Sequence, residues 1–380
     1  MSSHIPVEIL CEIFEHYIPP YPECPPLLGP GSPANLAQVC ARWRSIALDV
    51  CWLWRAIELD LDPWRSSLSM STIPTLCEMA KTSLARSGPL PLSIIFRCPP
   101  SVKESVLSLA FGILLAHCAR WQHASITIPA ALSLEERYDD EPRDMPLLRQ
   151  LQIRAADGLA EHDLLFLRAP QIQTLGVRFT SHPFAVADLF ASYAWKQLTT
   201  LKLDRTSVDY AAAVLPLTPA LERCWLQIWQ RPDNLRWPPT FSPIHLPKLK
   251  TFIIDATKVP GAKTAKEANR LLDVLVLPTL HCLAIADSFV AALSHAGPGM
   301  HAAYLDALAF LVQRWGCFTS LEKMSILHWP EKNKITRGDI MAALPSVTHL
   351  ELDQMANTTA GQWRPAAEDF DCRSVEPVEW

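Results

Sequence analysis

The chain has 380 residues, of which 49% are hydrophobic and 19% are charged, and its formal net charge is −5. This composition is typical of a packed globular protein and argues against a largely disordered chain. The negative balance gives no electrostatic support for binding nucleic acid, which usually requires a basic face. The length allows two or three domains, or one domain followed by a repeat array.

The chain contains eleven cysteines, an odd number, and most lie within apolar stretches, as Cys118 and Cys224 do. This placement is typical of reduced thiols in an intracellular protein. The first helix-like stretch contains Glu8 and Glu12 and follows no basic region, so it does not resemble a signal peptide. The longest apolar run, residues 106–119, is too short to span a bilayer. We therefore expect a protein of the cytoplasm or nucleus that does not enter a membrane.

The first fifty residues have the hydrophobic period of helices. Ile9, Ile13 and Tyr17 form one apolar stripe and Leu10 and Phe14 form another, with Pro6 suited to the first turn. The proline-rich residues 19–33 must form a loop. Helical spacing then resumes as one continuous face at Leu36, Val39, Trp43, Ile46, Ala47 and Val50. Two short helices that pack only on each other cannot cover apolar faces as wide as these, so part of the apolar surface needs another partner.

From about residue 90 the period changes, and one eight-residue template recurs. It reads proline, any residue, apolar, two variable residues, apolar, one variable residue, apolar, with the proline missing from two copies. Recurrence at this spacing is the signature of a repeat architecture. The eight copies lie at residues 146–153, 170–177, 196–203, 219–226, 247–254, 278–285, 319–326 and 345–352.

The end of the template predicts a strand, because its last two apolar residues lie two apart and point the same way. Residues 92–96 and 123–128 are additional strand candidates, and residues 162–169, 186–195 and 304–315 are compatible with helices between strands. One strand and one helix per repeat predict an α/β fold, a curved parallel solenoid. It resembles the leucine-rich-repeat horseshoe in an irregular form.

The stretch "IPVEILCEIF", followed after a loop by "LAQVCARWRSIAL" and "LWRAIEL", resembles an F-box over residues 5–59. The order of the later segments is similar to that of the large F-box families of mushroom-forming fungi. The resemblance implies a helical module that binds the Skp-type adaptor of an SCF ubiquitin ligase and, through it, a cullin. It also implies the adaptor-binding residues Ile5, Pro6, Leu10, Ile13, Leu36, Val39 and Trp43. The alternative is that all of these residues form the core of one helical subdomain.

The sequence contains no motif that predicts catalysis. Gly-x-Ser-x-Gly, His-Glu-x-x-His and P-loop patterns do not occur, and the histidines have no metal-ligand spacing. We therefore expect that the protein is not an enzyme and that it has no catalytic residue, metal or cofactor.

The residues between the apolar pairs of the template predict the concave face of the solenoid. Trp225, Ile253 and Asp255 are the candidates for binding a target protein there, because an apolar patch with a polar rim favours a partner site. Two alternatives remain: a flanking loop covers Trp225, or a one-residue slip turns it inward.

These inferences combine into one organisation and one predicted function. We expect an F-box module at 1–60, a helical linker or cap at 61–90, the solenoid at 91–355 and an acidic mobile tail at 356–380. The predicted function is that of a non-catalytic substrate-recognition subunit of an SCF-type ubiquitin ligase. The alternative is an adaptor-bound scaffold without a role in degradation.

Overall fold

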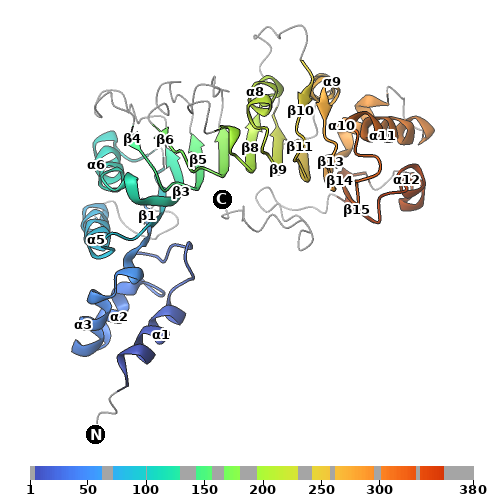
Figure 1. Ribbon diagram of the computed structural model, residues 1–380. Helices are drawn as coiled ribbons and strands as arrows, with labels where there is room; N and C mark the ends of the chain where they lie inside the picture. The colour runs from blue at the N-terminus through green and yellow to red at the C-terminus, as the bar shows by residue number, and fades with distance from the viewer. Residues whose placement is uncertain are drawn as a thin grey trace. The chain divides into compact units, whose positions relative to one another are not determined.

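A computed structural model gives the fold (Figure 1). The chain divides into two compact units, Met1–Leu198 and Thr199–Trp380, and each is considered by itself. The structure describes residues 5–61, 72–99, 101–128, 143–155, 167–179, 195–229, 242–256, 262–294, 301–330 and 334–354.

The N-terminal unit begins with a module of three short helices. They are α1 (Val7–Tyr17), α2 (Pro33–Val39) and α3 (Ala41–Asp49), followed by a 3-10 turn, η1 (Cys51–Trp54). The Ser32 hydroxyl accepts a hydrogen bond from Ala34 N at the start of α2, and Pro33 occupies the first turn, which is the chemistry of a helix start. The predicted continuous helical face is therefore wrong at Cys40, whose extended backbone (φ −160°) separates α2 from α3.

This module has a small core of its own. Leu10 and Phe14 of α1 pack with Leu36 of α2, and Leu53 and Trp54 complete the cluster. The Trp54 indole N–H donates to the Ala47 carbonyl oxygen at 2.8 Å, so the ring is held in place. Trp43 is half-buried against the same cluster, its ring edge-on to Phe14 with centroids 5.1 Å apart.

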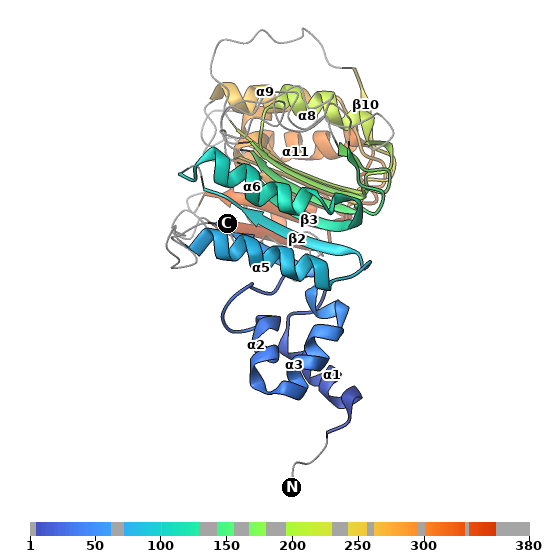
Figure 2. The ribbon, with the colours of Figure 1, turned by 90° about the vertical axis from the view of Figure 1, so that its left-hand side faces the viewer.

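The rest of the N-terminal unit is a parallel sheet covered by helices (Figure 2). Helices α5 (Ile73–Arg86) and α6 (Glu104–Leu115) pack beside the first strands, and the contact between Phe96 and Phe111 joins strand to helix. In order across the sheet, the strands are β1 (Ala56–Asp60), β2 (Leu92–Arg97), β3 (Trp121–Ile128), β5 (Gln150–Ala155) and β7 (Thr174–Phe179). The 3-10 turn η3 (Cys118–Arg120) precedes β3, and the two-residue strands β4 (Arg143–Asp144) and β6 (Leu167–Arg168) pair with each other.

The C-terminal unit repeats the same plan, with parallel strands and connecting helices. Its strands, in order, are β8 (Thr200–Thr206), β9 (Arg223–Ile228), β11 (Thr251–Ala256), β13 (Cys282–Ala286), β14 (Lys323–Trp329) and β15 (His349–Gln354). Its helices are α8 (Val208–Val214), α9 (Ala262–Leu272), α10 (Asp287–Leu293), α11 (His301–Trp315) and α12 (Arg337–Ala343), with the 3-10 turn η6 (Leu215–Leu217). The two-residue strands β10 (Ile244–His245) and β12 (Leu275–Val276) form a separate pair.

In each of the eight copies of the sequence template one of these strands begins at the fifth residue, so the predicted strands are present. The third residue of the template is buried and closes a tight turn. In the first copy this residue is Leu148, whose backbone N–H donates to the Met145 carbonyl oxygen at 3.1 Å. Pro146 is the second residue of that turn, a position that suits its fixed φ and needs no N–H. The strand begins two residues further on, at Gln150.

Only some of the predicted helices lie within the described residues. Residues 304–315 fall within α11, as predicted, and α5 lies in the segment predicted as a helical linker. Residues 186–194 and the tail at 356–380 lie outside the described residues, as does most of the segment 162–169, whose described end belongs to β6. In the part of the chain that the structure describes, no helix is long and apolar enough to cross a bilayer.

Candidate functional site

Helix α1 carries the two apolar stripes that its sequence predicts, and the structure buries one of them and leaves the other exposed. Leu10 and Phe14 are buried in the module, whereas Ile9 and Ile13 are 44% and 39% exposed, with Tyr17 following one turn later at 38%. Side chains four residues apart lie above one another on a helix, so these three form one line along α1. The module therefore presents an apolar ridge to its surroundings.

Further exposed apolar residues flank this ridge. Val39, at the end of α2, is 60% exposed, and Val7 and Ile5 are 46% and 37% exposed. The Arg42 guanidinium donates to the Ile5 carbonyl oxygen at 2.5 Å, which fixes the strand-like entry to α1 against α3. Solitary exposed apolar residues need no explanation, but several on one small module favour a partner surface.

The predicted adaptor-binding residues divide into two groups in this structure. Ile5, Pro6, Ile13 and Val39 are exposed and Trp43 is half-buried. Leu10 and Leu36 are 1% and 2% exposed, so the prediction that they lie at the surface is wrong. The reason is that the module needs both leucines to fill its own core beside Phe14.

Val7, Ile9 and Tyr17 were missing from the predicted set although they lie on the exposed side of α1. The signal was present in the sequence as the spacing of Ile9, Ile13 and Tyr17. Spacing alone does not say which of two apolar stripes faces the module's core.

The proline-rich loop that follows α1 holds the module against the sheet of the same unit. The Tyr21 hydroxyl donates to Gln122 Oε1 at 2.8 Å, and the Arg55 guanidinium lies 3.9 Å from the centre of the Tyr21 ring. Burial raises the pKa of the Tyr21 hydroxyl to about 12, so this group keeps its proton at physiological pH. The Ser93 hydroxyl on β2 donates to the Pro22 carbonyl oxygen at 2.5 Å. The loop thus braces the module.

One face of the C-terminal sheet lies opposite the helices that the structure describes and is called the helix-free face below, and the middle residues of the template form the predicted row on it. Phe252 contacts Trp315 of α11, so the alternating residue Ile253 points to the opposite face. Lys202, Trp225, Ile253, Ala284, Ser325 and Glu351 pair in register across successive strands. Trp225 therefore lies on the helix-free face, and the alternative of a one-residue slip does not apply.

The predicted target-binding residues are less accessible than expected. Trp225 is half-buried, but Ile253 and Asp255 are each 3% exposed, so the prediction that they form an open patch is wrong. Ile253 packs with Ala284 and Leu327 in one apolar cluster that Trp225 borders.

Asp255 is buried because it has specific partners. Its Oδ1 lies 2.7 Å from His328 Nε2 and accepts from Ala256 N at 2.6 Å. The hydrogen bond to Asp255 raises the pKa of His328, which favours its protonated form. Burial raises the pKa of Asp287, whose carboxylate accepts from the Tyr304 hydroxyl at 3.1 Å. The Asp255–His328 contact joins the ends of β11 and β14, and the Asp287–Tyr304 contact joins α10 to α11.

Among the described residues, no group of three histidine, cysteine, aspartate or glutamate side chains could hold a metal ion. Burial raises the pKa of the thiols of Cys98 and Cys317 to about 12, so neither forms a thiolate readily.

Comparison with known families bears on the module alone. Residues 2–60 match the F-box-like family model. No curated protein matches the chain. F-box domains bind Skp-type adaptors and usually act as non-catalytic adaptors, so the match supports an F-box protein with such an adaptor as a partner. The exposed ridge of α1 lies within the matched residues. The large parallel sheet that follows the module is consistent with a solenoid-like domain.

Proposed function

We propose that this protein is the substrate receptor of an SCF-type ubiquitin ligase. The observation that carries the proposal is the F-box-like match over residues 2–60, in which Ile9, Ile13 and Val39 remain exposed. An adaptor that covers these side chains would remove apolar surface from water, which is the main driving force of most protein association. The module would thereby connect the chain to the adaptor and to a cullin.

The mechanism is proximity rather than chemistry on this chain. A receptor that holds a target beside a charged ubiquitin-conjugating enzyme raises the effective concentration of the target's lysines. The brace formed by Tyr21 and Pro22 supports this role, because it limits the movement of the module against the first strands. We place the protein in the cytoplasm or nucleus, where such ligases act.

The target-binding surface that we propose is the helix-free face of the C-terminal sheet, centred on Trp225. Trp225 combines a large ring with a cation, since Lys202 Nζ lies 3.7 Å from its ring centroid. Aromatic anchors of this kind are enriched among residues that dominate binding energy. Ile253 and Asp255 support this surface from beneath and do not contact a target while buried.

Two aspartate substitutions test the adaptor assignment in the full-length chain. Ile13→Asp on the ridge and Val39→Asp beside it each place a carboxylate on exposed apolar surface, where it costs several kcal/mol if an apolar interface buries it. We expect both variants to fold and to lose binding to a purified Skp-type adaptor. Leu109→Asp is the matched control, because Leu109 of α6 is 56% exposed and lies outside the module. Undiminished adaptor binding by both module variants would overturn the proposal.

The alternative function is an adaptor-bound scaffold that directs no degradation. Reconstitution with cullin, ubiquitin-activating and ubiquitin-conjugating enzymes separates the two, because a receptor promotes ubiquitin transfer to a co-purified protein. A scaffold binds the adaptor equally well and leaves its bound proteins unmodified.

A further inference from the structure

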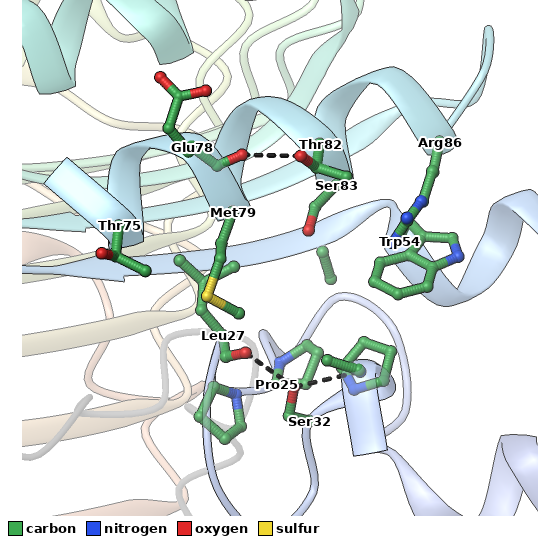
Figure 3. Close-up of a pocket in the computed structure, with 14 residues that line it drawn as sticks. Pro25, Leu27, Ser32, Trp54, Thr75, Glu78, Met79, Thr82, Ser83 and Arg86 are labelled. Atoms are coloured by element: carbon green, nitrogen blue, oxygen red, sulfur yellow. Dashed lines mark hydrogen bonds between the residues drawn. The ribbon is translucent and has the colours of Figure 1, made fainter. Parts of the chain in front are cut away.

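An apolar cavity lies between the helical module and α5 (Figure 3). Its volume is about 210 Å³, and Pro25, Leu27, Trp54 and Met79 provide much of its lining. For comparison, an engineered apolar cavity of about 150 Å³ is large enough to bind benzene. The space therefore accepts a single ring with a short chain.

One buried hydroxyl faces this cavity. Ser83 on α5 is 7% exposed, and Figure 3 shows its side chain pointing toward the space between Met79 and Trp54. No hydrogen bond joins the Ser83 hydroxyl to another described residue, and Ser83 lines the cavity. The Ser32 hydroxyl, also in the lining, already donates to the Leu27 carbonyl oxygen at 2.8 Å. Ser83 therefore offers a hydroxyl donor and acceptor to a ligand in the cavity.

A cation lies one turn further along the same face of α5. Residues three apart are neighbours on a helix surface, and Ser83 and Arg86 both line the cavity. The Arg86 guanidinium carbon lies 4.8 Å from the Trp54 ring centroid and, within the described part of the chain, has no carboxylate partner. A guanidinium matches the geometry of a carboxylate better than that of any neutral group.

We propose that this cavity binds a small monocarboxylic acid whose apolar body is about one ring in size. The ring lies against Leu27, Met79 and Trp54, and the carboxylate accepts hydrogen bonds from Ser83 and Arg86. Glu78 also belongs to the lining, but its carboxylate points away from the cavity in Figure 3 and pairs with Lys81 at 2.6 Å, so it does not oppose a bound carboxylate. The proposal goes beyond the role of the module in adaptor binding and does not depend on it.

The test compares 3-phenylpropionate with its neutral counterpart 3-phenylpropionamide, using calorimetry on the full-length chain. The two probes differ only in the head group, so the difference in affinity reports on Ser83 and Arg86. We expect the acid to bind about tenfold more tightly than the amide or better, since hydrogen bonds to charged groups are strong. Arg86→Leu should abolish this preference, and Ser83→Ala should weaken acid binding several-fold.

Ser83→Ala keeps the helix intact because alanine is the best helix former. Arg314→Leu is the matched control for Arg86→Leu, because Arg314 also lies in the last turn of its helix, α11. It should leave binding unchanged. Equal affinity for acid and amide, no binding of either probe, or an unchanged preference in folded Arg86→Leu would overturn the proposal.

Discussion

Lys202 places its Nζ 3.7 Å from the centroid of the Trp225 ring, so a cation covers the main aromatic side chain of the helix-free face. Trp225 also packs against the cluster of Ile253, Ala284 and Leu327. The ring is therefore shared between a buried cluster and the surface. This arrangement lies between the exposed anchor and the core residue that the sequence left as alternatives.

Trp225→Ala should consequently destabilise the protein by an intermediate amount. Replacing a fully buried tryptophan with alanine lowers the free energy of unfolding by about 3–5 kcal/mol. For a half-buried ring with a cation–π contact the decrease should be about 2 kcal/mol. Urea denaturation of the full-length chain measures this difference directly.

Trp315→Ala provides the comparison for that variant. Trp315 is 0% exposed, and its indole N–H donates to the Leu272 carbonyl oxygen at 2.8 Å. Trp315→Ala should lower the free energy of unfolding by about 4 kcal/mol, as expected for a fully buried tryptophan. If Trp225→Ala costs as much as Trp315→Ala, the ring is a core residue and the proposed target surface must be moved.

Leu10→Asp should unfold the helical module instead of only removing its partner surface. Leu10 is 1% exposed and packs beside Phe14, so an aspartate there buries a carboxylate without a cation. We expect the variant to lose both adaptor binding and resistance of residues 5–55 to limited proteolysis. Ile13→Asp should lose binding alone. Normal protease resistance in Leu10→Asp would show that the module's core is not where the structure places it.

The contrast between these two substitutions shows what the sequence could and could not predict. The template residues specified eight strands and the register of Trp225 with Ile253, because alternation along a strand leaves little choice. The two stripes of α1 were also visible, but both are apolar, so only packing decides that Leu10 faces inward and Ile9 outward. The helix break at Cys40 escaped prediction for the same reason, since apolar spacing continues through it.

Burial on the helix-free face was harder to predict. Alternation correctly assigned Ile253 and Asp255 to that face, yet it carries no information on how deeply neighbours cover them. The partner of Asp255 is His328, 73 positions away in the sequence. No local pattern connects two such residues. The cavity beside Ser83 likewise depends on segments that only the fold brings together.

The Asp255–His328 pair predicts a pH-dependent contribution to stability. Its hydrogen bond raises the folded-state pKa of His328, so the protonated form stabilises the fold. That contribution is fully present below the unfolded-state pKa of about 6.5 and is lost as the pH rises through the higher folded-state pKa. The contribution of this group to the free energy of unfolding should therefore fall as the pH rises above about 6.5.

His328→Asn isolates this effect. His328 has a φ of 58°, a left-handed conformation that asparagine tolerates better than most residues. Burial lowers the pKa of His117 and His123, so these two histidines make the free energy of unfolding rise with pH. They are present in both the wild type and His328→Asn, so their effect cancels in the difference between the two. The difference between wild type and variant, measured by urea denaturation, should shrink as the pH rises. A difference independent of pH would show that His328 does not gain its proton on folding.

The brace between loop and sheet gives the final prediction. Tyr21→Phe removes the hydroxyl that donates to Gln122 Oε1 at 2.8 Å but keeps the ring under Arg55. The loss leaves a partly buried acceptor without its donor, which should cost about 1 kcal/mol. Because the hydroxyl joins the proline-rich loop to β3, hydrogen exchange of residues 18–32 should accelerate more than exchange in the sheet. Tyr17→Phe is the control: Tyr17 is 38% exposed, and water can replace its hydroxyl as the acceptor for Gly31 N and Asn35 Nδ2. Equal effects of the two substitutions on loop exchange would mean that Tyr21 does not brace the module.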